Sequence, residues 1–268
     1  QENIIFHKIS QSVTTQILSS LDKMASGEKE KYSAFWKEHG RIFKLGYADY
    51  ANQEKYMNLL RFNSSSSKDE NELISLQDYV SKMKPEQKEI FFILGANREN
   101  VEYNLHPEIF RSKGLEVLYL FDPLDEFALS SLRKFKDFEF ISVDLADLSK
   151  IDKYDNVTSK DNKAEELSQD DEKAFAELMA KIKAILGERV TDVKISKRLQ
   201  ESPACLVNPD DTMSSSMQKI MKIVGKDTSI PKKVLEINKD HNLFRNMLKA
   251  FKNNREDTFI RDVIEQLF

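Results

Sequence analysis

The chain has 268 residues and a formal net charge of −4, from 45 acidic and 41 basic side chains. Such a near balance gives no electrostatic sign of binding to a nucleic acid or an anionic membrane. The single cysteine, Cys205, excludes a disulfide within the chain and suits a reducing compartment. No apolar run approaches the roughly 20 residues that span a bilayer. The length allows one large domain or two ordinary ones.

The first 60 residues have the periodicity of successive helices. Apolar residues recur at helical spacing from Ile5 to Met24. Ser26 is a candidate N-cap and Gly40 a candidate C-cap for the next helix. Three helices are therefore expected, over 5–24, 26–40 and 52–62, and a polar loop follows over 63–72.

The character of the sequence changes after residue 76. Short continuous apolar runs, rich in aromatic and β-branched residues, are typical of buried parallel strands. Three such strands are expected, at 89–96, 115–121 and 138–143. The intervening segments are predicted to be helical, with one ending at Gly114 and the other covering 124–135. This alternation of strands and helices predicts a small α/β unit.

Residues 149–172 are dense in charge and nearly free of large apolar side chains, which predicts a linker. A second domain is expected over 173–268. Its first helix has an apolar face from Phe175 to Leu186 and is expected to end at Gly187. Strands are predicted at 190–199, 203–208 and 232–238, and helices at 210–225, 241–251 and 257–268. The predicted fold class is α/β (α+β), with a helical coil, a small αβα sandwich and a mixed α/β C-terminal domain.

Three carboxylates, Asp122, Asp125 and Glu126, follow the second predicted strand within five residues. Asp122 precedes Pro123 and so suits the N-cap position of a helix, while the other two would lie in its first turn, where the helix dipole favours negative charge. The alternative is a general acid/base pair at the carboxyl edge of a parallel sheet. Helix capping is the favoured interpretation.

Other candidates for chemistry are weak. The four histidines, His7, His39, His106 and His241, share no metal-ligand spacing with one another or with Cys205. Because Cys205 lies in an apolar strand, an inert buried thiol is expected rather than a nucleophile. No metal site and no catalytic residue are therefore predicted.

The predicted helix at 210–225 carries Met213, Met217, Ile220 and Met221 on one face. Methionine is flexible and polarizable, so a face of this kind can adapt to many partners. The alternative is an ordinary core stripe. The three consecutive serines at 214–216 favour a helix that is only loosely held at the surface.

Several long segments, in chain order, resemble the heat-shock protein 90 chaperones, most closely their bacterial members. They are "KYSAFWKEHGRIFKLG", "LISLQDYVSKMKPEQKEIFFILG", "GLEVLYLFDPLDEFAL", "VKISKRLQESPACLV" and "VLEINKDHNLF". The similarity runs from residue 1 to the end of the chain. One departure concerns the residue after "SP", which is cysteine in many eukaryotic members and is Ala204 here.

The resemblance implies a position within a three-domain chaperone. Residues 1–148 would be the later part of the middle domain, 149–172 the charged junction, and 173–268 the C-terminal domain without its final dimerisation helices. The N-terminal ATP-binding domain would lie outside this chain. The fragment itself is therefore expected not to be an enzyme, although the full-length family member would be an ATPase that uses ATP and Mg²⁺.

The resemblance also implies sites and partners. Gln1 would contact the γ-phosphate of ATP held by the N-terminal domain of the same chain. Met213, Met217, Ile220 and Met221 would contact unfolded or partly folded client proteins. The full-length protein would be a cytoplasmic homodimer, with dimerisation weak or absent in this chain. Two rival hypotheses remain: an α/β enzyme that uses Asp122, Asp125 and Glu126, and a scaffold module that binds no client.

Overall fold

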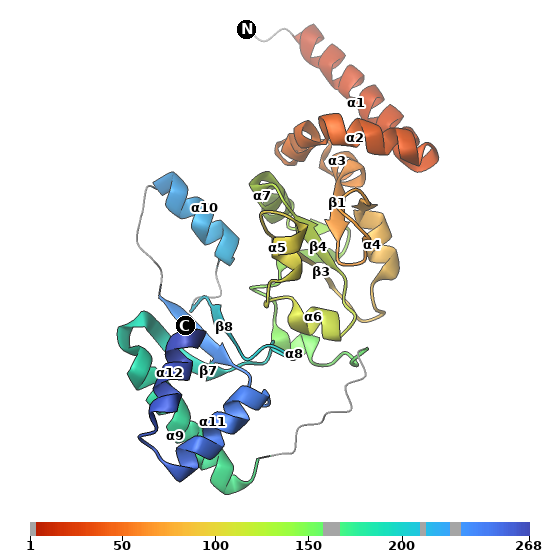
Figure 1. Cartoon of the computed structure of the whole chain (residues 1–268). Helices are drawn as coiled ribbons and strands as arrows, with labels where there is room; N and C mark the ends of the chain where they lie inside the picture. Colours follow the sequence, from red (N-terminus) through yellow and green to blue (C-terminus); the bar gives the residue numbers. More distant parts are fainter. Residues whose placement is uncertain (1–3, 158–166, 210–212, 226–231) are drawn as a thin grey trace. The chain divides into compact units, whose positions relative to one another are not determined.

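A computed structural model describes residues 4–157, 167–209, 213–225 and 232–268 of the chain (Figure 1). By its internal contacts the chain divides into two compact units. The first unit consists of Gln1–Glu102 and Glu116–Ser142, and the second of Tyr103–Leu115 and Val143–Phe268. The domain boundaries at 148 and 173 that the sequence suggests stay a prediction.

The first unit begins with helices, as predicted. They are α1 (Ile4–Gly27), α2 (Lys29–Lys44) and α3 (Gln53–Leu59), with a short 3₁₀ helix, η1 (Leu45–Ala48), between the last two. The predicted caps of the second helix are wrong. Ser26 lies inside α1, where its hydroxyl donates to the Asp22 carbonyl. Gly40 lies inside α2 because its missing side chain leaves room for the ring of Trp36, which a Cβ would approach to 2.6 Å.

A six-stranded sheet forms the centre of the first unit, with the strand order β2-β1-β4-β3-β6-β5. The central strands β4, β3 and β6 are parallel, as the continuous apolar runs predict, and the outer pairs are antiparallel. The strands are β1 (Arg61–Ser64), β2 (Ile74–Ser75), β3 (Glu89–Leu94), β4 (Val117–Leu120), β5 (Lys134–Phe135) and β6 (Phe138–Ser142). Helices α4 (Leu76–Lys82), α5 (Arg98–Glu102) and α7 (Pro123–Leu132) complete the unit.

Two helix ends differ from the sequence-based expectation. The predicted helix at 52–62 ends at Leu59, because residues from Arg61 onward pair with β2 and β4. The predicted helix at 124–135 ends at Leu132, because Arg133 has a φ of 63° and the next two residues pair with β6. In both cases the last residues of the predicted helix form a strand instead, because they pair with a strand from elsewhere in the chain.

The second unit is built on a three-stranded sheet with the order β7-β9-β8. Its strands are β7 (Val190–Ile195), β8 (Ala204–Val207) and β9 (Lys233–Ile237), with β7 parallel and β8 antiparallel to β9. The helices are α6 (Glu108–Ser112), α8 (Leu148–Ile151), α9 (Gln169–Leu186), α10 (Ser215–Gly225), α11 (Asn242–Asn253) and α12 (Thr258–Leu267). The α/β fold class is thus confirmed. Gly187 caps α9 with a φ of 55°, as predicted.

The apolar core of the second unit lies between its sheet and three helices. Helices α9, α11 and α12 gather on one side of the sheet (Figure 1). Their buried apolar residues pack with those of β7 and β9. Phe244, Met247 and Phe251 of α11 are at most 4% exposed. In the described part of the chain, no helix is long and apolar enough to cross a membrane.

Candidate functional site

Asp122 caps helix α7 rather than facing an active site. Its Oδ1 accepts the backbone N–H of Leu124 at 3.0 Å, and Pro123 occupies the first helical position. The guanidinium of Arg41 lies 3.1 Å from the other carboxylate oxygen. The capping interpretation is confirmed for this residue, since proline at the first position and a carboxylate acceptor before it are typical of a helix start.

Asp125 and Glu126 lie in the first turn of α7, as predicted, but both are buried, at 4% and 2% exposed. Lys44 Nζ lies 2.7 Å from Asp125 Oδ1. Burial raises the pKa of Asp125 above its ordinary value, while Lys44 opposes the shift. A buried carboxylate that is paired with a lysine suits a structural role better than a role in acid/base catalysis, because it is shielded from solvent.

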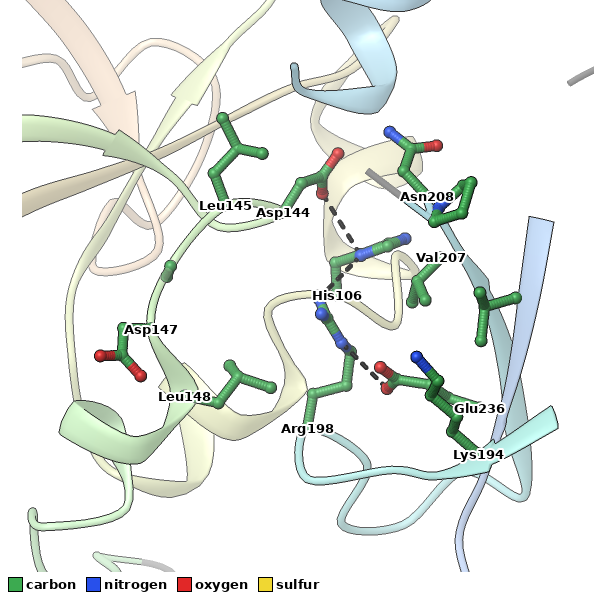
Figure 2. A pocket seen from close by; sticks show the side chains of 13 residues that line it. His106, Asp144, Leu145, Asp147, Leu148, Lys194, Arg198, Val207, Asn208 and Glu236 are labelled. Carbon is green, nitrogen blue, oxygen red and sulfur yellow. Dashed lines mark hydrogen bonds and ion pairs between the residues drawn. The ribbon is translucent and has the colours of Figure 1, made fainter. Parts of the chain in front are cut away.

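A cavity of about 420 Å³ lies in the second unit (Figure 2). Its polar lining includes His106, Asp144, Arg198 and Glu236. Its apolar lining includes Leu145, Leu148, Val207 and Val234. The polar residues come from four separate parts of the sequence, which only the fold brings together.

These four polar side chains form one continuous network (Figure 2). Glu236 Oε2, on β9, accepts from Arg198 Nε at 3.1 Å and from the Ser196 hydroxyl at 2.7 Å. Arg198 Nη1 lies 3.1 Å from His106 Nδ1, which is in turn 3.3 Å from Asp144 Oδ1. Burial lowers the pKa of His106, although Asp144 opposes the shift. The neutral ring can accept from Arg198 or donate to Asp144 through Nδ1, but not both at once.

A third carboxylate, in addition to those of Asp144 and Glu236, lies in the same unit. Glu108 is 7% exposed, and its Oε1 accepts the backbone N–H groups of Gln200 at 2.9 Å and Ser202 at 3.0 Å. The N–H of Glu201, between them, donates to the same oxygen. One carboxylate therefore satisfies three successive donors of the β7–β8 connection and ties this loop to α6.

The apolar residues predicted to contact clients lie on or just before α10. Met213, Met217 and Ile220 are half-buried, and Met221 is 51% exposed. Helix α10 begins at Ser215, whose N–H donates to Asp144 Oδ2 at 2.8 Å. Methionine and isoleucine side chains with this much exposure form an accessible apolar surface, unlike the fully buried Met247 of α11.

The other sequence candidates fall outside these networks or outside the described residues. Gln1 lies outside the described part of the chain. Cys205 is buried, as predicted, and burial raises its thiol pKa to about 12. His241 caps α11 by accepting the N–H of Leu243. Among the described residues, no group of three or more His, Cys, Asp or Glu side chains could hold a metal ion.

Sequence reasoning missed Arg198, Glu236, Asp144 and Glu108. Arg198 and Glu236 lie in predicted strands, and a strand pattern does not indicate that a charged side chain within it has a functional role. The available signal is a charged residue at an otherwise apolar or strand position, because such residues are seldom buried without a partner. That signal identifies Arg198 as a candidate but cannot name its partners.

Comparison with known proteins identifies the family. The chain matches the Hsp90 protein family over residues 1–268. It belongs to the Hsp90 family. The chaperone protein HtpG of Nitratidesulfovibrio vulgaris is 45% identical over 268 residues, which are all of this chain and 42% of the relative. HtpG of Oleidesulfovibrio alaskensis is 44% identical over the same share.

A more distant relative gives the same result. HtpG of Legionella pneumophila is 35% identical over 267 residues, which are 99% of this chain and 41% of that protein. This Hsp90-family chain therefore spans about two fifths of the length of the curated relatives that it matches. The residues that line the cavity and those of α10 all lie within the segment that matches these relatives.

Proposed function

We propose that this chain is part of an ATP-dependent molecular chaperone that binds and remodels unfolded or partly folded client proteins. Membership of the Hsp90 family and identity to several HtpG chaperones support the proposal. ATP and Mg²⁺ enter it as cofactors of the whole protein. Gln1 is proposed to contact the γ-phosphate of ATP in that protein, and ATP turnover is assigned to the whole protein and not to this chain.

Client contact is proposed for α10, through Met213, Met217, Ile220 and Met221. The observation that carries this proposal is the half-buried to exposed state of these four apolar side chains. An apolar helix face left accessible costs solubility unless a partner covers it for part of the time. Methionine suits clients of varied sequence because its side chain adapts its shape to the partner.

The remaining parts of the proposal concern the whole protein. We assign residues 1–148 to the later part of a middle domain, 149–172 to a junction and 173–268 to a C-terminal domain. The N-terminal ATPase domain of the same protein, a second copy of the chain in a homodimer and client proteins are the proposed partners. A cytoplasmic location is proposed from the family.

Aggregation of a chemically denatured test protein, followed by light scattering with and without the chain, tests the proposal. The wild-type chain should slow aggregation, and Met217→Glu with Met221→Glu should weaken this effect several-fold while circular dichroism shows an unchanged fold. Charged side chains on α10 would repel apolar client segments because burying them without a partner is costly.

The matched control is Ile195→Glu with Leu206→Glu, which makes the same charge change at apolar residues 46% and 38% exposed on the second sheet. This variant should keep the activity of the wild type. Equal loss in both variants would reject α10 as the client-contacting surface. A wild-type chain without any effect on aggregation would favour the scaffold hypothesis, and unfolding of the methionine variant would show that the apolar face belongs to the core.

A further inference from the structure

Helix α10 is held by its unit in a different way from its neighbours. Helices α9, α11 and α12 each place several side chains in the apolar core of the second unit. Among the side chains that the structure describes in α10, none is fully buried. The described side chains of α10 therefore contribute less to the apolar core than those of the other three helices do.

The start of α10 is bound by a carboxylate from far away in the sequence. Asp144 Oδ2 accepts the N–H of Ser215, 71 residues further along the chain, at 2.8 Å. Helices α8, α9, α11 and α12 are each capped by the residue just before them, Asp147, Ser168, His241 and Asp257. Helix α10 also has such a local cap, because the Ser214 hydroxyl accepts the N–H of Met217 at 3.1 Å. The contact with Asp144 is therefore an addition to the local cap of α10. A local cap stabilises a helix wherever the helix lies, whereas a distant carboxylate also fixes where the helix begins.

Asp144 is itself held in place from the sheet of the same unit. Its side chain is 11% exposed, and its other oxygen lies 3.3 Å from the His106 ring. That ring contacts Arg198, which is paired with Glu236 on the central strand β9 (Figure 2). The acceptor of the Ser215 N–H thus lies beside the His106 ring, whose Nδ1 can donate to Asp144 whenever it does not accept from Arg198.

We propose that Asp144 is a positioning residue for α10, which fixes the start of the helix and with it the direction in which Met217 and Met221 are presented to a client. The inference rests on the client contact proposed for α10. The positioning itself can be tested independently of any client, because it concerns a single hydrogen bond within the second unit.

The sharpest variant is Ser215→Pro. Residue 215 is the first of α10, a position that tolerates proline well, so the helix is retained while the Ser215 N–H that donates to Asp144 Oδ2 is removed. Asp144→Ala removes the acceptor instead. Asp144→Asn keeps an acceptor oxygen and is the conservative variant that should restore most of the contact.

Amide hydrogen exchange of residues 215–221, measured by mass spectrometry on the whole chain, is the direct readout. Ser215→Pro and Asp144→Ala should each speed exchange of the remaining amides in this segment about tenfold, and the double variant should exchange no faster than either single one. Asp147→Ala, which removes a nearby local cap, should leave exchange in α10 unchanged. Wild-type exchange rates in both single variants would overturn the proposal.

The aggregation assay separates this inference from the proposed function. Faster exchange in α10 together with reduced protection of the test protein supports both. If exchange in α10 is faster but the chain still slows aggregation as the wild type does, Asp144 positions α10 and this positioning has no effect on client contact. If Asp144→Ala unfolds the unit, Ser215→Pro still decides, because it leaves the network of Asp144, His106 and Arg198 intact.

Discussion

Lys44 and Asp125 form a buried ion pair in the first unit, with 2.7 Å between Lys44 Nζ and Asp125 Oδ1 and with side chains 14% and 5% exposed. The lysine is the last residue of α2 and the aspartate lies in the first turn of α7. The contact therefore joins α2 to α7. It also explains how a carboxylate can be buried at the start of α7.

Removing the lysine should destabilise the first unit strongly. Lys44→Ala leaves Asp125 buried without its cation, which costs about 3 kcal/mol of unfolding free energy at pH 7. Urea unfolding followed by the fluorescence of Trp36, the single tryptophan, measures this loss. Lys31→Ala, which removes an exposed pair with Glu28, should cost about 0.5 kcal/mol or less.

The cost of Lys44→Ala should depend on pH in a defined direction. Because burial raises the pKa of Asp125, the folded state binds its proton more tightly than the unfolded chain, and the charged form is penalised as pH rises through the folded pKa. The loss caused by Lys44→Ala should therefore be smaller at pH 4 than at pH 7. A loss of equal size at both values, or no recovery on adding Asp125→Asn, would contradict this account.

His106 should make the second unit less stable in mild acid. Burial lowers the pKa of His106 in the folded state, so the unfolded chain binds the proton more readily. The stability that neutral His106 contributes is complete above its ordinary pKa of 6.5 and is lost as pH falls from there towards the lower folded value. Urea unfolding of wild type and His106→Gln between pH 8 and 5 should give a steeper decline for wild type, and parallel curves would refute the prediction.

Glu108 should be one of the most sensitive polar residues of the second unit. Glu108→Ala leaves three backbone donors, at Gln200, Glu201 and Ser202, without their acceptor and should cost about 3 kcal/mol. Glu108→Gln keeps one acceptor oxygen and should cost less. Thermal unfolding followed by circular dichroism measures both, and an alanine variant as stable as the glutamine variant would show that the three hydrogen bonds contribute little.

Cys205 should report unfolding of the second unit. Its thiol is buried, and burial raises its pKa to about 12, so that almost no thiolate forms at neutral pH. Iodoacetamide at pH 8 should label the native chain many times more slowly than the chain in urea. Native labelling as fast as in urea would show that this strand opens freely.

Sequence patterns predicted much of the fold because they report local geometry. The runs that became β3, β4 and β6 were identified as parallel strands, and Asp122 as a helix cap. Their signals are contained within a few neighbouring residues. The ends of α3 and α7 were predicted too late in the chain, because strand partners from other segments compete for those residues.

The candidate site was predictable only in part. Periodicity placed Met217, Ile220 and Met221 on one helix face, but it could not distinguish a core stripe from an accessible surface. That distinction depends on what packs against the helix. Likewise no sequence signal near Asp125 indicates that its partner is Lys44, which lies 81 positions earlier.

Local patterns in the amino-acid sequence are enough to predict the fold class and most of the elements, and its long ordered segments are enough to predict the Hsp90 family. The folded chain was needed to show which charged side chains are buried and which groups they contact, as for Asp144 with Ser215 and for Glu108 with the loop at 200–202. The physical reason is the sequence separation over which each kind of interaction acts. Helix and strand preferences act between residues a few positions apart, whereas burial and ion pairing depend on groups that the chain brings together only when it folds.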